Sequence, residues 1–365
     1  MENSGSLYEM SVELMSDEQL KRELTFDLYG RYAIIRDIIN LNKTGQEQLR
    51  ILDVGGRGNL LKKFLPGDDV SYLDPLVDTD DENYIEGDGC DIPLEDGSFD
   101  YVVSSDVFEH IEPSRRDEFL TENLRVAKSG VILGAVFHSP ERELAEKYAN
   151  ESYRYLSGGE DHFWLKEHID NGLPQSSELE GLLGKKGHAF QKIPNNNLRL
   201  WEYLLCSTFV LLAAGKIEKI KDFNEFYNDR IYPRDHGEGS YRTIYFIKKS
   251  EGLKELELGE GGIDDGLYLE AISNTTSFLY DVYLEDKDLF EKLKIELQEK
   301  VNQIVKKNNQ IVKKNNQIIE TEAALAVAKF EVAGLKASFS WRITGPLRAV
   351  RAKAGKISAG KSRKS

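Results

Sequence analysis

The residues most able to do chemistry in this chain are three acids and a serine that lie in or after short apolar runs. Asp53 lies within the first run, Asp74 ends the second, and Ser105 and Asp106 follow a third. Ligands of open parallel sheets bind at the carboxyl ends of the strands, so these side chains are expected to line one site. A carboxylate there attracts a cationic ligand, and the acid that ends the second strand can accept both hydroxyls of a ribose. Asp106 could instead only cap the helix that follows it.

A glycine cluster made of Gly55, Gly56 and Gly58 lies between the first two runs. Glycines allow the backbone to pass close to a bulky ligand and to adopt positive φ. The segment from Arg50 to Asp74 therefore predicts strand, glycine turn, helix, strand and acid, the nucleotide-binding half of a doubly wound sheet. It lacks the G-x-G-x-x-G of dinucleotide sites, and Asp53 suits a cation better than a pyrophosphate. A glycine turn without a ligand is the alternative.

This stretch resembles motif I of the class I S-adenosylmethionine-dependent methyltransferases, although Arg57 and Asn59 stand where glycines are common. GDGCDIPLEDGSFDYVVSSDVFEHIEP, further along the chain, resembles the next motifs of that family. The resemblance implies a mostly parallel Rossmann-like sheet with an antiparallel last strand, methyl transfer as the activity and S-adenosylmethionine as the cofactor. It also implies that Asp88 and Gly89 hold the adenine, beside the cofactor residues Asp53, Gly55, Gly56, Gly58, Asp74 and Ser105.

Two histidines are candidate bases beside Asp106. His138 lies just after the predicted fifth strand, and His162 lies in the segment GGEDHFWLKEHIDNGLP. A histidine can take a proton from a hydroxyl near neutral pH. His138 could equally hydrogen-bond the next turn, and His168 is expected to cap and pin a helix. No H-x-x-x-H or C-x-x-C spacing occurs there, so no metal site is predicted.

The same segment, with PNNNLRLWEYL and a later YNDRIYPRDHGEGSYRTIYFIKK, resembles methyltransferase-like proteins associated with bacterial surface polysaccharide, O-antigen or capsule. The residues that match this pattern are Asp161, His162, Trp164, Glu167, His168 and Trp201. The resemblance implies O-methylation of a sugar, with alignment of hydroxyl and methyl as the main catalytic effect. A scaffold that has lost transfer, and a methyltransferase of a small lipid or quinone, are the alternatives; Arg57 and Asn59 favour the scaffold.

An internal repeat of seven residues predicts a coiled coil. Asn308 and Asn315 fall at core positions, where asparagine fixes register and a low oligomer number, so a dimer or trimer is expected. The apolar residues that recur every seventh position are Phe290, Leu297, Ile304, Ile311, Ile318, Leu325 and Val332.

The tail after Ser340 carries eight Lys or Arg and no acid. Its SWRITGPLR resembles a motif at the ends of bacterial enzymes that assemble cell-surface glycan. A basic amphipathic segment suits the anionic inner face of a membrane, and a disordered basic tail is the alternative.

The composition of the 365 residues limits the classes of function. A net charge of −15 argues against nucleic acid as a partner. The two cysteines, the lack of a signal-peptide pattern and the lack of a membrane-spanning run predict a cytoplasmic protein, peripheral on the inner membrane through its tail. The predicted divisions are a methyltransferase domain at 1–250 with a helical segment at 12–40, a linker and short helix at 251–284, a coiled coil at 285–335 and a basic tail at 336–365.

Overall fold

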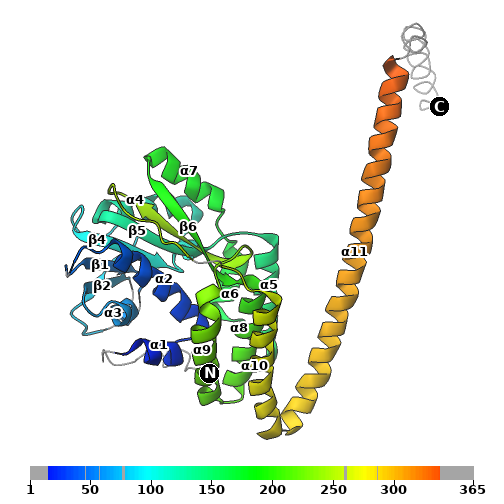
Figure 1. The fold of residues 1–365 in the computed structure, drawn as a ribbon, viewed down its shortest axis with the longest axis horizontal. Helices are drawn as coiled ribbons and strands as arrows, with labels where there is room; N and C mark the ends of the chain where they lie inside the picture. Colours follow the sequence, from blue (N-terminus) through cyan, green and yellow to red (C-terminus); the bar gives the residue numbers. More distant parts are fainter. Residues whose placement is uncertain are drawn as a thin grey trace, which may run out of the picture. The chain divides into compact units, whose positions relative to one another are not determined.

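The computed structural model describes residues 15–337 except 46, 57, 76–78, 259–260 and 286, and it gives no side chains for 282–295 and 335–337. The chain forms two compact units, residues 1–285 and 286–365 (Figure 1). The predicted tail and Arg57 therefore lie outside the described residues.

A seven-stranded sheet in the order β3-β2-β1-β4-β5-β7-β6 forms the centre of the first unit (Figure 1). β7 runs antiparallel to both of its neighbours, and every other pair is parallel. The prediction of a Rossmann-like sheet with an antiparallel last strand is thus confirmed. The strands are β1 (Arg50–Val54), β2 (Asp69–Asp74), β3 (Tyr84–Glu86), β4 (Phe99–Ser105), β5 (Ala127–Val136), β6 (Ala189–Asn197) and β7 (Ser240–Lys248).

The central strands are apolar on both faces because helices cover both. Along β1 and β4, Ile51 and Val103 join the core on one face, whereas Leu52 and Val102 join the core on the other. This alternation follows from the two-residue period of a strand, and burial of both faces explains the continuous apolar runs. The first core is completed by α1 (Asp17–Glu23), α2 (Phe26–Asn42) and α3 (Leu60–Phe64), and the second by α4 (Arg116–Val126) and α7 (Ser176–Lys186).

The helical segment predicted near the N-terminus is two helices, because each start has its own cap. The Ser16 hydroxyl accepts from the Gln19 N–H at 3.2 Å, and the Gln19 side chain accepts from the Ser16 N–H at 2.8 Å. This capping box starts α1. The Thr25 hydroxyl accepts from the Leu28 N–H at 3.4 Å and starts α2.

Two helical insertions enlarge the first core. α5 (Pro140–Ser157) and α6 (Phe163–Asn171) precede α7 between β5 and β6. α8 (Leu198–Ala213), α9 (Ile217–Phe226) and the short turns η3 (Tyr227–Ile231) and η4 (Tyr232–Arg234) connect β6 to β7. α8 packs against α5 and α9, and its Leu200, Trp201, Leu204, Phe209 and Leu211 are buried.

The stretch predicted as a linker and short helix at 251–284 packs on the first unit, and its helix is α10 (Asp265–Glu285). Leu253, Leu256 and Ile263 pack against the core. α10 packs on α8 and α9, where Lys219 pairs with Asp281 at 2.8 Å. The compact unit therefore continues to residue 285 rather than ending near residue 250.

The second unit, in its described part, is one long helix, α11 (Lys287–Ala337). Its repeating apolar side chains are exposed, with Ile311 and Ile318 each 53% accessible. Within residues 15–337 and their stated gaps, none of the helices combines the length and apolar character needed to cross a membrane.

Candidate active site

The glycine loop after β1 is shaped by backbone conformations that few residues accept. Gly55 has a φ of 82° and donates its N–H to the Leu73 carbonyl at 2.7 Å. A Cβ on Gly56 would lie 2.5 Å from the Asp53 carboxylate, so no side chain fits there. Asn59 has a φ of 49°, a left-handed conformation that asparagine tolerates better than most residues. This explains how asparagine can stand where a glycine is common.

Asp53 lies under this loop with 2% of its surface exposed. The Tyr32 hydroxyl donates to its Oδ2 at 3.4 Å. Burial raises the pKa of Asp53 to about 7, despite the opposing effects of Arg31 and the Tyr32 hydroxyl. A cation at the loop would favour the ionised carboxylate, which is the property expected of a residue that faces an ammonium or sulfonium group.

Asp74 ends β2 and Asp88 follows β3, so both acids lie near the carboxyl ends of strands. Asp74 is buried, and its carbonyl accepts from the Tyr84 hydroxyl at 2.8 Å. Asp88 accepts from the Cys90 N–H and from Arg115, both at 2.9 Å. Burial opposes ionisation, but these two donors outweigh it and lower the pKa of Asp88.

Gly89 follows β3 and Ser105 ends β4, so both lie near the carboxyl ends of strands. A Cβ on Gly89 would approach Phe119 to 2.6 Å and Val54 to 3.0 Å, so the backbone there is in close contact with α4 and β1. Ser105 ends β4, and its buried Oγ has no hydrogen-bond partner among the described residues. This Oγ lies against β5, because a Cβ on Gly134 would come within 3.1 Å of it.

Asp106, a candidate base or helix cap, instead lies between two arginines. Arg31 pairs with its Oδ2, and Arg242 donates from both Nε and Nη2, the latter at 2.6 Å. Burial would raise the pKa of Asp106, but Arg242 and Arg31 together lower it to about 2. No side-chain cap is formed at η1 (Phe108–His110), so the cap alternative is wrong. A carboxylate held this acidic is a weak base.

Arg242 is the centre of that cluster and ties four elements together. It is 1% exposed and also donates to Asp27 of α2 at 2.9 Å and to Asn195 and Asn196 of β6 at 2.9 and 3.0 Å. The sequence analysis missed it because its partners are far away along the chain. A basic residue inside an otherwise apolar strand was the available signal.

The two candidate histidines have different surroundings. His138 follows β5, and its Nε2 lies 3.2 Å from the Glu143 carboxylate in a half-exposed position. The His162 ring packs between Tyr153 of α5 and Phe209 of α8, with centroid distances of 5.0 and 5.2 Å. Burial, with a smaller effect of His168, lowers the pKa of His162 to about 4. The His162 ring is therefore neutral near pH 7. Its ring contacts are with aromatic side chains of α5 and α8, unlike those of the other predicted site residues.

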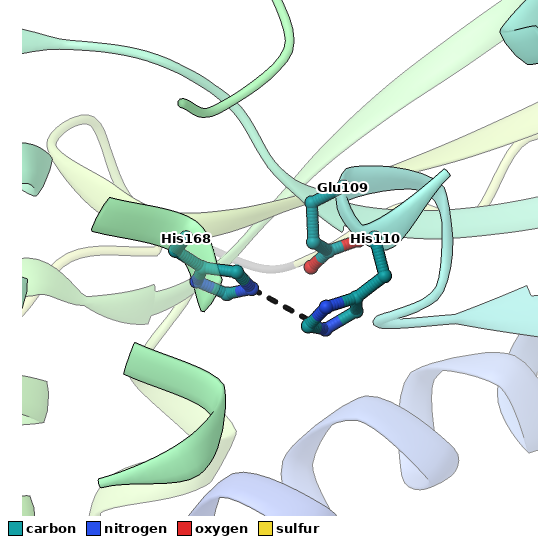
Figure 2. Close-up of side chains that lie close together, drawn as sticks. All are labelled: Glu109, His110 and His168. Atoms are coloured by element: carbon teal, nitrogen blue, oxygen red, sulfur yellow. Dashed lines mark hydrogen bonds between the residues drawn. The ribbon is translucent and has the colours of Figure 1, made fainter. Parts of the chain in front are cut away.

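A third group, which the sequence analysis did not assign, gathers Glu109, His110 and His168 (Figure 2). The first two lie in η1, directly after β4, and His168 lies in the last turn of α6. The His168 Nε2 is 3.3 Å from the His110 Nε2. His168 was expected to pin a helix; its Nδ1 does join α6 to Glu146 of α5, at 2.9 Å. The recurrence of Glu-His in FEHI and KEHI was the signal that could have linked the two segments.

Residues 71–135 match the family model described as a methyltransferase domain. The matched range runs from β2 to β5 and includes Asp74, Asp88, Ser105 and Glu109. No curated protein sequence matches the chain.

Three solved structures are among those similar to this chain. The YcgJ protein of Bacillus subtilis is 16% identical, with 60% of this chain and 98% of that chain covered and a TM-score of 0.34. Haemonchus contortus phosphoethanolamine N-methyltransferase 2, in complex with phosphomonomethylethanolamine and S-adenosylhomocysteine, is 17% identical. The match covers 60% of this chain and 52% of that chain, with a TM-score of 0.35. The magnesium protoporphyrin IX methyltransferase of Synechocystis with bound SAH is 11% identical. The match covers 67% of this chain and 91% of that chain, with a TM-score of 0.38.

Proposed function

We propose that this chain is an S-adenosylmethionine-dependent methyltransferase, because residues 71–135 match a methyltransferase domain and the sheet has the order expected of class I. We further propose that its acceptor is a sugar hydroxyl of a bacterial surface polysaccharide or its precursor. The observation that carries the proposal is an exposed aromatic pair beside the polar residues that follow β4. Phe163 and Trp164, 69% and 45% exposed, begin α6, and the Trp164 ring lies 5.3 Å from the His110 ring. A sugar packs its C–H face on such a ring while its hydroxyls reach polar groups.

The residues at the carboxyl edge of the sheet fit the cofactor. Asp53 and the glycine loop would hold the amino-acid end, Asp74 the ribose, and Asp88 with Gly89 the adenine. The unpaired Ser105 hydroxyl supplies one further polar group at the same edge. Bound S-adenosylmethionine supplies a methyl group on a sulfonium, which is open to attack by an oxygen nucleophile. In this proposal, the chain's own contribution is to hold the hydroxyl in line and to accept its proton.

We propose His138 as the base, because its ring is accessible and lies beside the Glu143 carboxylate. Its ring is partly exposed beside Glu143, whereas Asp106 is held ionised by two arginines and His162 is enclosed by aromatic rings. His162 and Asp106 remain the other candidates.

The decisive experiment incubates the full chain with S-adenosylmethionine carrying a labelled methyl group and with separate panels of nucleotide sugars, glycan precursors, lipids and quinones. We expect labelled methyl on a sugar oxygen, located by NMR, and none on the other panels. Label on a lipid or quinone would contradict the sugar proposal. Cofactor binding without transfer to any panel would favour the scaffold alternative.

We also propose that α11 mediates self-association and that the basic tail contacts an anionic membrane surface, which would make the cytoplasmic protein peripheral on the inner membrane. Support for the first is the exposed apolar row of α11, which a single helix leaves in water. Support for the second is the charge of the tail, whose residues lie outside the described range.

A further inference from the structure

Two imidazole rings face each other at the carboxyl end of β4 through the same kind of nitrogen (Figure 2). The His110 Nε2 and the His168 Nε2 are 3.3 Å apart. The contact is a long hydrogen bond when one of the two nitrogens is protonated. The same separation suits two nitrogens that share one ion at bond lengths of about 2.0–2.1 Å. The two rings come from η1 and α6, so any shared ion would join the sheet edge to the inserted helices.

The outer nitrogen of each ring contacts a carboxylate, which fixes where the proton lies. The His110 Nδ1 is 2.9 Å from Glu167, and the His168 Nδ1 is 2.9 Å from Glu146. Glu146 also accepts from the Tyr241 hydroxyl at 2.8 Å, so it acts as an acceptor on both sides. An ionised carboxylate can only accept, so each Nδ1 that faces one carries a proton. In a ring that has no second proton, the lone pair is then on Nε2.

The rings are tilted by 38° with their centroids 4.7 Å apart. If neither Nε2 carries a proton, the two lone pairs repel at this distance unless a cation lies near both nitrogens. A carboxylate on the far nitrogen is also the arrangement that commonly orients a metal-binding histidine. The alternative to a metal ion is a single proton shared by the two rings.

Glu109 completes the group with a carboxylate oxygen. Its Oε1 accepts from the Val136 N–H at 3.1 Å, while its buried Oε2 has no partner among the described residues. One ligand atom from each of Glu109, His110 and His168 lies within 4.8 Å of the other two. An unpaired carboxylate oxygen with no solvent around it is costly, and a bound cation would remove that cost.

We propose that Glu109, His110 and His168 bind one divalent transition-metal ion. Two imidazole nitrogens and one carboxylate oxygen favour Zn²⁺, Mn²⁺ or Co²⁺ over Ca²⁺ or Mg²⁺, which prefer sets made of oxygen. Three protein ligands leave at least one coordination position open, as in catalytic metal sites. The ion would be part of the methyltransferase site. The spacing of motifs along the sequence does not reveal this metal site.

The role of the ion rests on the sugar acceptor proposed above. A hydroxyl bound at the open position would lose its proton to water more easily, because the cation stabilises the oxyanion. A sugar stacked on Trp164 would lie beside His110, one of the three ligands. The nucleophile would therefore be prepared next to the end of β4, where the cofactor residue Ser105 lies.

The test titrates metal into the untagged full chain after chelator treatment, without cofactor or acceptor. Free Mn²⁺ is measured by electron paramagnetic resonance, and Co²⁺ by its visible absorption. We expect one Mn²⁺ per chain and a Co²⁺ spectrum of low coordination number with nitrogen ligands. The changes Glu109→Gln and His168→Ala should weaken Mn²⁺ binding roughly a hundredfold or more, and Glu167→Gln about tenfold to a hundredfold.

His188→Ala, which removes a histidine in the turn before β6, is the matched control and should leave Mn²⁺ binding unchanged. Circular dichroism and Tm establish that each variant is folded, and the partly exposed Glu167 provides a variant with little risk to the core. A folded wild-type chain that binds neither ion, with one imidazole doubly protonated by ¹⁵N NMR, would overturn the proposal in favour of a shared proton.

Binding that is unaffected by both Glu109→Gln and Glu167→Gln would overturn it as well. Because the titration contains no acceptor, its outcome is separate from that of the acceptor screen. A bound Mn²⁺ together with methylation of something other than a sugar would support the metal site and contradict only the proposed acceptor.

Discussion

The carboxylates at the edge of the sheet differ in charge because their partners differ. Asp106 faces two guanidinium groups, and its pKa lies near 2. Asp53 is more deeply buried, its hydrogen-bond donor is a neutral Tyr32 hydroxyl, and its pKa lies near 7. The first is a fixed negative charge within a balanced cluster. The second can change its protonation state when a cation arrives, which is the behaviour that a binding residue needs.

The ribose role of Asp74 can be tested by removing its carboxylate. Asp74→Ala should lose two charge-assisted hydrogen bonds to S-adenosylmethionine, at about 1.5–3 kcal/mol each. Isothermal titration should show the loss, while Asp69→Ala, an exposed acid at the start of the same strand, should bind normally. Equal affinities for Asp74→Ala and wild type would remove Asp74 from the site.

Cofactor affinity should depend on pH through Asp53. Below about pH 7 the free protein holds Asp53 protonated, whereas a bound cation favours the ionised form, so binding must release a proton. Affinity should therefore rise with pH, by up to roughly tenfold per unit, and level off above about pH 7. Titrations between about pH 5.5 and 8.5 check this. Asp53→Asn should flatten the profile; a profile already flat in wild type would contradict the role of Asp53.

The candidate bases can be separated by their kinetics. His138→Ala should lower kcat roughly a hundredfold or more and leave cofactor affinity nearly unchanged, as expected for a residue that takes the acceptor proton. His162→Ala removes a ring between Tyr153 and Phe209, so Tm should be measured beside kcat. If both variants turn over normally, neither histidine is the base, and loss of the proton to water from a hydroxyl bound to the proposed ion becomes the favoured route, because Asp106 is a weak base.

Local spacing allowed some of these residues to be predicted and not others. The positions of Asp53, the glycines, Asp74 and Ser105 follow from strand ends, which a periodic apolar pattern reveals. Arg31 and Arg242 could not be found in that way, because they meet Asp106 only after the sheet and α2 have packed together. The contact of His110 with His168 likewise joins segments 58 positions apart.

At the scale of elements, α10 explains why a glycine-rich stretch does not mark the end of the domain. Composition alone suggested a linker after residue 250, since polar and glycine residues dominate there. Isolated apolar residues in it, such as Leu256 and Ile263, nevertheless pack against the core. The sheet was predictable because each strand carries its own pattern, whereas packing of α10 on α8 and α9 depends on matching surfaces.

Shortening the chain tests this boundary. A chain ending after residue 285 keeps α10 and should be monomeric, bind S-adenosylmethionine and unfold cooperatively. A chain ending after residue 250 exposes the sides of α8 and α9 that α10 covers and should have a Tm lower by several degrees, since about 1 kcal/mol shifts Tm of a domain above 150 residues by about 2–4 °C. Equal Tm values by calorimetry would mean that α10 contributes nothing to the fold.

At the scale of the whole molecule, charge and self-association are connected. The chain carries a net charge of −15 although its tail is strongly basic, so the rest of the chain is more acidic still. An acidic protein is repelled by an anionic surface, and attraction must come from the tail alone. Several tails held side by side by α11 would multiply a weak attraction through proximity.

The last prediction joins these properties. The full chain should sediment as a dimer or trimer, because the row that includes Ile304 and Ile311 is exposed on a single helix. Ile311→Glu places a charge in that row and should yield monomers. Lys313→Glu changes the charge two positions away, outside the row, and should leave the oligomer intact.

The full chain should also float with vesicles containing anionic lipid at low salt, at about 1 kcal/mol per basic residue near the surface. Ile311→Glu should float less than wild type although its tail is unchanged, because each tail then acts alone. A full chain that is monomeric in light scattering contradicts the oligomer. Flotation equal in wild type and Ile311→Glu contradicts the link between oligomer and membrane, since avidity requires several tails on one particle.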